Sequence, residues 1–215
     1  MHRVLVVPGL AVRRYAVPAA EEVRRRGVDV DLLPAPGSPG RPADLRRYGE
    51  LLARELTARP GTDLLVGLSV GAQGAAVAAL VAGAAVRHLV LVSPTVDPRL
   101  RSTGQLLRRW ATAGRLESPR LLLEQAPDWW QAGARQVTAV LRSALDVRIE
   151  DLVDDVSAGL TVVHAERDAV TSHAYAARLA VDHGGHLLVV PGATHSWPYA
   201  DEARFADVLE RLLRE

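Results

Sequence analysis

Three residues whose types together turn a hydroxyl group into a nucleophile occur along the chain in the order Ser, Asp, His. Ser69 is the centre of the pattern G-x-S-x-G at residues 67–71, and Asp168 and His195 each follow a later apolar run. A serine hydroxyl is a poor nucleophile at neutral pH, so it needs a base such as His195 and an acid that orients the base. This order of residues predicts acyl-transfer chemistry at Ser69.

The context of Ser69 strengthens this interpretation, because the five-residue pattern alone is common by chance. The pattern follows the strand-like run 63–66 and precedes the helix-like run 72–81. A sharp turn from strand to helix holds a serine in a strained conformation with its hydroxyl exposed. Gly67 and Gly71 supply small residues where the strand and the helix nearly touch.

Two other carboxylates compete with Asp168 for the role of the acid. Glu166 lies two residues earlier, and Asp97 follows the fourth apolar run. We favour Asp168, because one helix and one strand separate it from His195, so that both residues follow strands. His164, at a strand end, is expected either to lie in the core or to support the residues of the site from behind.

Six short apolar runs alternate with segments of helical period, such as residues 45–56 and 205–212. The runs are rich in Val and Leu without polar alternation, as expected for strands buried on both faces. We therefore predict an α/β fold with a doubly wound, mostly parallel six-stranded sheet flanked by helices. Its carboxyl edge would bring Ser69, Asp168 and His195 together. The six runs are Val4–Val7, Val28–Leu33, Leu64–Gly67, His88–Val92, Leu160–His164 and His186–Val190.

One segment breaks this alternation. Residues 97–146 show no strand signal, and their apolar residues fall at helical spacing. We predict a helical cap insertion at 97–146 over the ligand crevice, with residues 1–96 and 147–215 as the core. Tryptophans in and near this region either line an acyl pocket or pack the cap on its base, and they are our candidates for substrate binding: Trp110, Trp129, Trp130 and Trp197.

With these motifs, the chain resembles the α/β-hydrolase superfamily over nearly its whole length. Residues 67–71 are similar to the nucleophile elbow of that family, residues 166–170 to its acid segment, and residues 192–195 to its histidine loop. The resemblance implies a Ser-His-Asp enzyme that needs no cofactor or metal. It also implies that the family's first hairpin is missing here, because the chain starts at the family's third strand. A serine at the elbow argues against dehalogenase and epoxide hydrolase chemistry.

The resemblance also implies an oxyanion hole made of two backbone N–H groups. One belongs to the residue after the nucleophile, which is Val70. The other comes from the loop after the first strand, where Leu10 is the candidate. The family often has His-Gly in this loop, and this chain has Pro8-Gly9. The departure leaves the donor in place, because the donor is a backbone group.

The leading hypothesis is a serine hydrolase that cleaves a carboxylic ester or thioester of a hydrophobic small molecule through an acyl-enzyme on Ser69. The same triad also serves acyltransferases, C–C hydrolases and lyases, so these activities stay open. A different class of function is also open, a non-catalytic protein that binds a small molecule on a hydrolase scaffold. The sequence determines neither the exact substrate nor the oligomeric state.

Composition excludes several other classes. The 215 residues are 48% hydrophobic and 24% charged, as in a soluble globular domain. With 26 basic and 25 acidic residues, the chain has a formal net charge of only +1, which argues against nucleic-acid binding driven by overall charge. The absence of cysteine excludes disulfides and thiolate metal sites, and His183 and His186 are expected at the surface rather than on a metal. The uncharged stretch 64–86 is interrupted by Gly and Ser, so we expect no membrane span. The first apolar run, Val4–Val7, is too short for the core of a signal peptide, so we expect a cytoplasmic protein.

Overall fold

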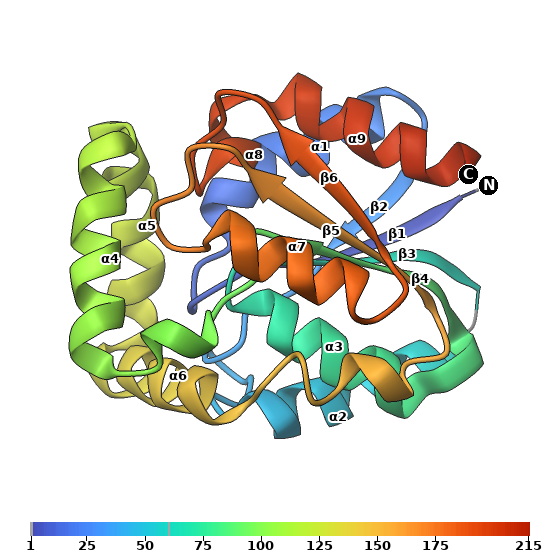
Figure 1. Cartoon of the computed structure of the whole chain (residues 1–215), viewed down its shortest axis with the longest axis horizontal. Helices are drawn as coiled ribbons and strands as arrows, with labels where there is room; N and C mark the ends of the chain where they lie inside the picture. Colours follow the sequence, from blue (N-terminus) through green and yellow to red (C-terminus); the bar gives the residue numbers. More distant parts are fainter. Residues whose placement is uncertain (1, 60) are drawn as a thin grey trace.

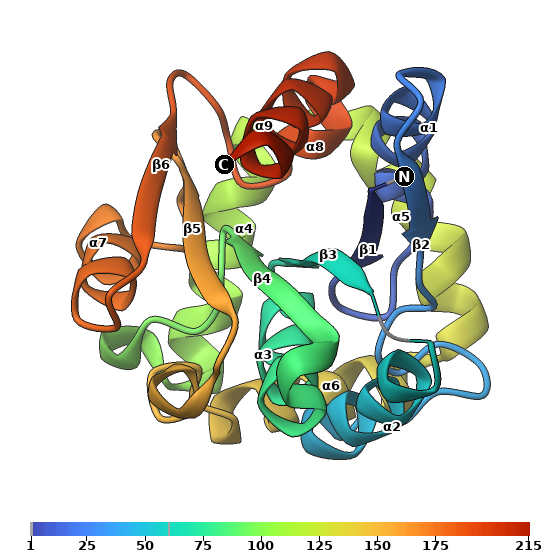
Figure 2. The ribbon, with the colours of Figure 1, turned by 90° about the vertical axis from the view of Figure 1, so that its right-hand side faces the viewer.

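A parallel sheet forms the centre of the molecule. In the computed structural model, which describes residues 2–59 and 61–215, the sheet has six strands in the order β2-β1-β3-β4-β5-β6. Every neighbouring pair runs parallel, and Figure 2 shows the strands in this order. Each strand overlaps one of the predicted apolar runs, so the predicted fold class is confirmed. The strands are β1 (Arg3–Val7), β2 (Asp29–Leu32), β3 (Thr62–Leu68), β4 (Val86–Val92), β5 (Gly159–Ala165) and β6 (His186–Val190).

Helices cover both faces of the sheet (Figure 2). One face packs against α1 (Val17–Arg25), α8 (Trp197–Ala200) and α9 (Glu202–Arg214). The other face packs against α2 (Leu45–Ala58), α3 (Gly71–Ala82) and α7 (His173–Val181). Short 3-10 turns are η1 (Arg14–Ala16), η2 (Gly83–Ala85), η3 (Pro98–Leu100) and η4 (Val153–Asp155). No helix within the described residues is both long and apolar enough to cross a membrane.

Three helices fill the segment between β4 and β5 in which we predicted a cap. They are α4 (Thr103–Leu116), α5 (Pro119–Ala132) and α6 (Ala134–Asp146). They lie at the carboxyl ends of the strands, at the end of the molecule opposite the two termini (Figure 1). The division of the chain into a core and a functional cap remains a prediction.

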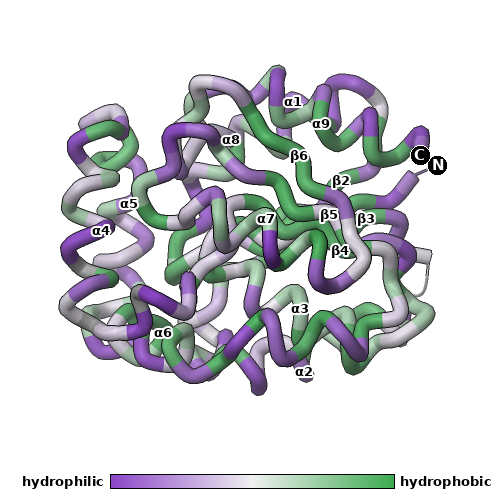
Figure 3. The backbone as a smooth tube through the Cα atoms, in the orientation of Figure 1, coloured by the Kyte–Doolittle hydropathy of each residue, from purple (hydrophilic) through white to green (hydrophobic). Residues whose placement is uncertain are grey.

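The outer strands are less buried than the sequence suggested. In β2, Val30 and Leu32 are buried while Asp29 and Asp31 are exposed. In β6, Val189 is 37% exposed. The expectation of burial on both faces is therefore wrong for these two strands, because a strand at the edge of the sheet is covered less completely than an inner one. Apolar residues concentrate on the strands in the middle of the molecule (Figure 3).

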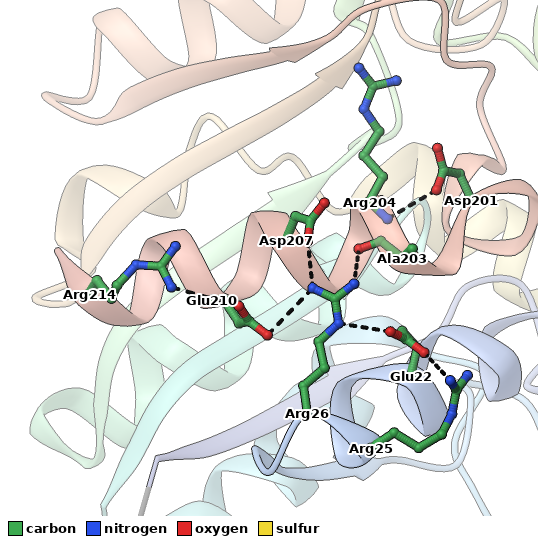
Figure 4. A network of polar contacts seen from close by, with 9 residues as sticks. All are labelled: Glu22, Arg25, Arg26, Asp201, Ala203, Arg204, Asp207, Glu210 and Arg214. Atoms are coloured by element: carbon green, nitrogen blue, oxygen red, sulfur yellow. Dashed lines mark hydrogen bonds and ion pairs between the residues drawn. The ribbon is translucent and has the colours of Figure 1, made fainter.

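A network of charged side chains fixes the last helix, α9, beside α1 (Figure 4). Arg26, at the end of α1, donates hydrogen bonds to Asp207 at 2.5 Å and to the carbonyl oxygen of Ala203 at 3.0 Å. Its Nε also donates to Glu22 of α1 at 2.8 Å. The guanidinium group thus joins the two helices, and α9 in turn packs against α8, which follows the loop of His195.

Candidate active site

Ser69 lies on the sharp turn between β3 and α3. Its φ angle is +52°, a left-handed conformation that costs about 1–3 kcal/mol in a residue other than glycine. A Cβ atom on Gly67 would lie 2.5 Å from Cα of Ala72, and one on Gly71 would lie 2.6 Å from the carbonyl oxygen of Pro8. Both neighbours are backbone atoms, so only glycine fits at these two positions. Gly67 is therefore required by the packing of β3 against α3, and Gly71 by the packing of α3 against the end of β1 and the residue after it.

Hydrogen bonds connect Ser69, His195 and Asp168 in a row. Oγ of Ser69 lies 2.8 Å from Nε2 of His195. Nδ1 of His195 lies 2.9 Å from Oδ2 and 3.0 Å from Oδ1 of Asp168. The Asp168 side chain is fully buried, and the His195 side chain is 12% exposed. The structure thus brings together the three residues that the sequence singled out, in the geometry of nucleophile, base and acid.

The surroundings of Asp168 keep its carboxylate ionised. Burial raises the pKa of Asp168, but the charge of His195 and its hydrogen bond act in the opposite direction. The backbone N–H groups of Val170 and Thr171 also donate to Oδ1, at 2.8 and 2.9 Å. Together these interactions hold the pKa of Asp168 below its ordinary value.

The charge state of His195 depends on two carboxylates. Burial lowers the pKa of His195, but the charge of Asp168, its hydrogen bond and the charge of Glu117 outweigh burial and raise it above its ordinary value. Glu117 lies between α4 and α5, and its Oε1 accepts the backbone N–H of Ser196 at 3.0 Å. A raised pKa means that the imidazolium form, which arises when the base takes a proton, is stabilised.

The two rival carboxylates bind elsewhere in the described part of the chain. Oε2 of Glu166 accepts the backbone N–H of Gly192 at 2.7 Å. Oδ2 of Asp97 accepts the hydroxyl of Ser172 at 2.5 Å. Both therefore shape loops near the site, and neither replaces Asp168. His164 is buried on β5, with its ring centroid 5.2 Å from that of His173.

The loop after β1 lies against the elbow. A Cβ atom on Gly9 would lie 3.3 Å from the backbone nitrogen of Val70, so the two segments are in close contact. Leu10 and Ala11 have φ angles of +37° and +58°. Within residues 2–59 and 61–215, no acceptor takes the backbone N–H of Leu10 or of Val70. Their role as an oxyanion hole remains a prediction.

A cavity of about 120 Å³ lies beside Ser69 and His195. Trp110 and Trp129 line it, as do several apolar residues of α4 and α5. The structure does not bring the other two candidate tryptophans to the cavity. Trp130 is 90% exposed, because consecutive residues of a helix point about 100° apart. Trp197 is buried in the core, with its ring centroid 5.7 Å from that of Phe205.

Several residues that line the cavity were not among the candidates predicted from the sequence. Leu121, Gln125 and Trp129 recur every four residues, so the helical period of α5 contained a signal for this face. Tyr15 and Glu117 also line the cavity, and no motif marks them. Among the described lining residues, Glu117 is the only carboxylate, and the rest of the wall is mostly apolar.

In the part of the chain that the structure describes, no three His, Asp or Glu side chains gather in a way that would hold a metal ion. His183 instead pairs with Asp154.

Comparisons with known proteins agree with this architecture. A model of the alpha/beta hydrolase family matches residues 4–208. Among solved structures, the chain is similar to a hydrolase from Oleispira antarctica, with a TM-score of 0.82, 13% identity, and coverage of 100% of this chain and 92% of that one. A thermophilic esterase from Thermogutta terrifontis gives a TM-score of 0.80 and 19% identity over 100% of this chain and 90% of that one. At such identities the likeness shows a shared fold. A search of curated protein sequences finds no match.

Proposed function

The chain belongs to the alpha/beta hydrolase family, and we propose that it is a serine hydrolase that cleaves a carboxylic ester or thioester of a hydrophobic small molecule. The observation that carries the proposal is the row of hydrogen bonds from Ser69 through His195 to Asp168. Family membership alone does not define the chemistry, because one fold supports many reactions.

The first half of the proposed reaction forms an acyl-enzyme. Oγ of Ser69 attacks the carbonyl carbon of the substrate, and Nε2 of His195, at 2.8 Å, takes the hydroxyl proton. Asp168 holds the imidazole by Nδ1 and stabilises its charged form. The N–H groups of Val70 and Leu10 receive the negative charge on the carbonyl oxygen. His195 then gives its proton to the leaving alcohol or thiol, and the acyl group stays on Ser69.

The second half releases the acid. A water molecule takes the place of the leaving group, and His195 removes its proton while the oxygen attacks the acyl carbon. The same two N–H groups stabilise the second oxyanion. The carbon–oxygen bond to Ser69 breaks, and His195 returns the proton to Oγ.

The cavity supports the choice of substrate class. Its wall is mostly apolar, with Trp110 and Trp129 as its largest side chains. Such a wall favours burial of an apolar acyl group over a highly charged one. The volume of about 120 Å³ fits a small or medium-sized acyl group better than a long lipid chain.

The proposal is tested with a series of p-nitrophenyl esters of increasing acyl length. We expect the wild-type protein to hydrolyse them and Ser69→Ala to lose this activity. Ser157→Ala is the matched control, because Ser157 is exposed and lies before the amino end of β5, away from the site. Equal turnover by the wild type and Ser69→Ala would overturn the proposal.

A further inference from the structure

Helix α5 makes direct contacts with the loop that carries Leu10. The indole Nε1 of Trp129 donates to the carbonyl oxygen of Leu10 at 3.0 Å. Oδ2 of Asp128 accepts the backbone N–H groups of Arg13 and Arg14, at 2.7 and 2.9 Å. Oδ1 of Asp128 also pairs with Nε of Arg14 at 3.0 Å. Two consecutive residues of α5 thus hold residues 10–14 by four polar contacts.

These contacts act on a strained segment. Leu10 and Ala11 both have positive φ angles although neither is glycine, and each such residue costs about 1–3 kcal/mol. A local bond from the N–H of Val12 to the carbonyl oxygen of Gly9, at 3.0 Å, closes the turn. A conformation of this kind persists only when its surroundings hold it. The bonds from α5 are part of those surroundings.

The contacts of α5 differ in their exposure to solvent: the bond from Trp129 to Leu10 is partly buried, and the bonds to Asp128 are more open. Leu10 is 3% exposed, and the Asp128 side chain is 14% exposed, whereas the Arg14 side chain is 59% exposed. The two bonds from backbone N–H groups to Asp128 are charge-assisted, which makes them stronger than bonds between neutral groups. The ion pair with Arg14 is open to solvent and contributes less.

We propose that Asp128 and Trp129 are positioning residues that hold the Leu10 loop in the conformation of an oxyanion hole. This inference rests on the proposed function. Trp129 fixes the peptide plane on one side of Leu10, while Gly9 on the other side lies against the elbow. The N–H of Leu10 is then directed by contacts on both sides. The helices between β4 and β5 are accordingly part of the catalytic apparatus as well as a wall of the cavity.

The test compares kcat and KM of full-length variants that remove these contacts in steps. Trp129→Phe removes the N–H donor and keeps an aromatic ring, and Asp128→Ala removes every acceptor. Asp128→Asn keeps one oxygen for the two backbone N–H groups. Trp130→Phe is the matched control, because Trp130 lies on the same helix and is 90% exposed. Melting temperatures show whether each variant is folded.

We expect Trp129→Phe and Asp128→Ala to lower kcat roughly tenfold or more, since loss of one aligned oxyanion donor costs about 10²–10³ in kcat. Asp128→Asn should lose less, and Trp130→Phe should match the wild type. The inhibition constant of an alkyl trifluoromethyl ketone, which forms an oxyanion on Ser69, should rise by about the same factor as kcat/KM falls.

Three results would overturn the inference. If both variants change KM but keep kcat and the affinity for the trifluoromethyl ketone, α5 only lines the cavity. If a folded wild-type protein neither hydrolyses esters nor binds the ketone, the proposed function fails, and this inference fails with it. An active wild type beside unaffected variants refutes the inference alone.

Discussion

Asp168→Asn should remove most of the activity while the fold stays intact. Oδ1 of Asp168 accepts the backbone N–H groups of Val170 and Thr171, which only an oxygen can do. In the variant, the amide oxygen must keep this position, so the NH₂ group faces Nδ1 of His195. Nδ1 then has to accept a hydrogen bond, and the ring proton moves to Nε2. There it points at Oγ of Ser69, 2.8 Å away.

A histidine in this tautomer cannot take the proton of the serine. The wrong tautomer in a triad of this type costs about 10⁴ in kcat, or roughly 5.5 kcal/mol of transition-state stabilisation. Both backbone N–H groups remain paired in the variant, so the loss of stability should be small. We expect a melting temperature within about 4 °C of the wild type, which corresponds to roughly 1 kcal/mol.

The assay measures kcat with a p-nitrophenyl ester at saturation, beside a thermal melt. Glu166→Gln is the matched control, because its amide oxygen can still accept the N–H of Gly192, and it should keep activity close to wild type. If folded Asp168→Asn retains more than about a tenth of the wild-type kcat, the tautomer argument is refuted. If Glu166→Gln is the variant that loses activity, the acid has been assigned to the wrong residue.

Three further changes test other parts of the site. Glu117→Gln keeps an acceptor for the backbone N–H of Ser196 but removes a negative charge that raises the pKa of His195. The pKa of His195 should therefore fall. The acid limb of the kcat/KM profile, where activity is lost as pH falls, should move to lower pH. An unmoved limb would contradict this. Gln73→Leu removes two bonds to carbonyl oxygens at the end of α6, both at 2.6 Å, and should lower the free energy of unfolding by about 2–4 kcal/mol. An unchanged urea midpoint would speak against it. Trp110→Ala enlarges the cavity, so the preferred p-nitrophenyl ester should have a longer acyl chain. An unchanged preference would place the acyl group elsewhere.

The strands and the three polar residues were accessible from sequence because their signals are local. A buried strand is a short run of Val and Leu, and Gly67 is required by a contact with Ala72, five residues later. The constraint on Gly71 comes from the distant backbone of Val7 and Pro8, but the pattern G-x-S-x-G marks the position all the same. Parallel strands then bring the residues that follow them to one edge of the sheet, which places Asp168 and His195 near Ser69. Local pattern and topology together were sufficient for this part of the site.

The contacts of α4 and α5 were not accessible in this way. Whether Trp129 or Trp130 faces the cavity depends on where α5 begins and how it is rotated against the core, which composition does not specify. No motif in the sequence distinguishes Asp128 or Glu117 from surface carboxylates. Their hydrogen bonds to the loops that contain Leu10 and His195 depend on how the helices pack. The exposure of β2 and β6 likewise depends on strand order, which no single run encodes.

The central claim is that Ser69 is an activated nucleophile. The most direct measurement is the intact mass of the protein after exposure to a fluorophosphonate, followed by identification of the modified peptide. We expect one adduct per chain, on the peptide that contains Ser69, and no adduct on Ser69→Ala. Absence of an adduct on folded wild-type protein, or an adduct that persists in Ser69→Ala, would contradict it.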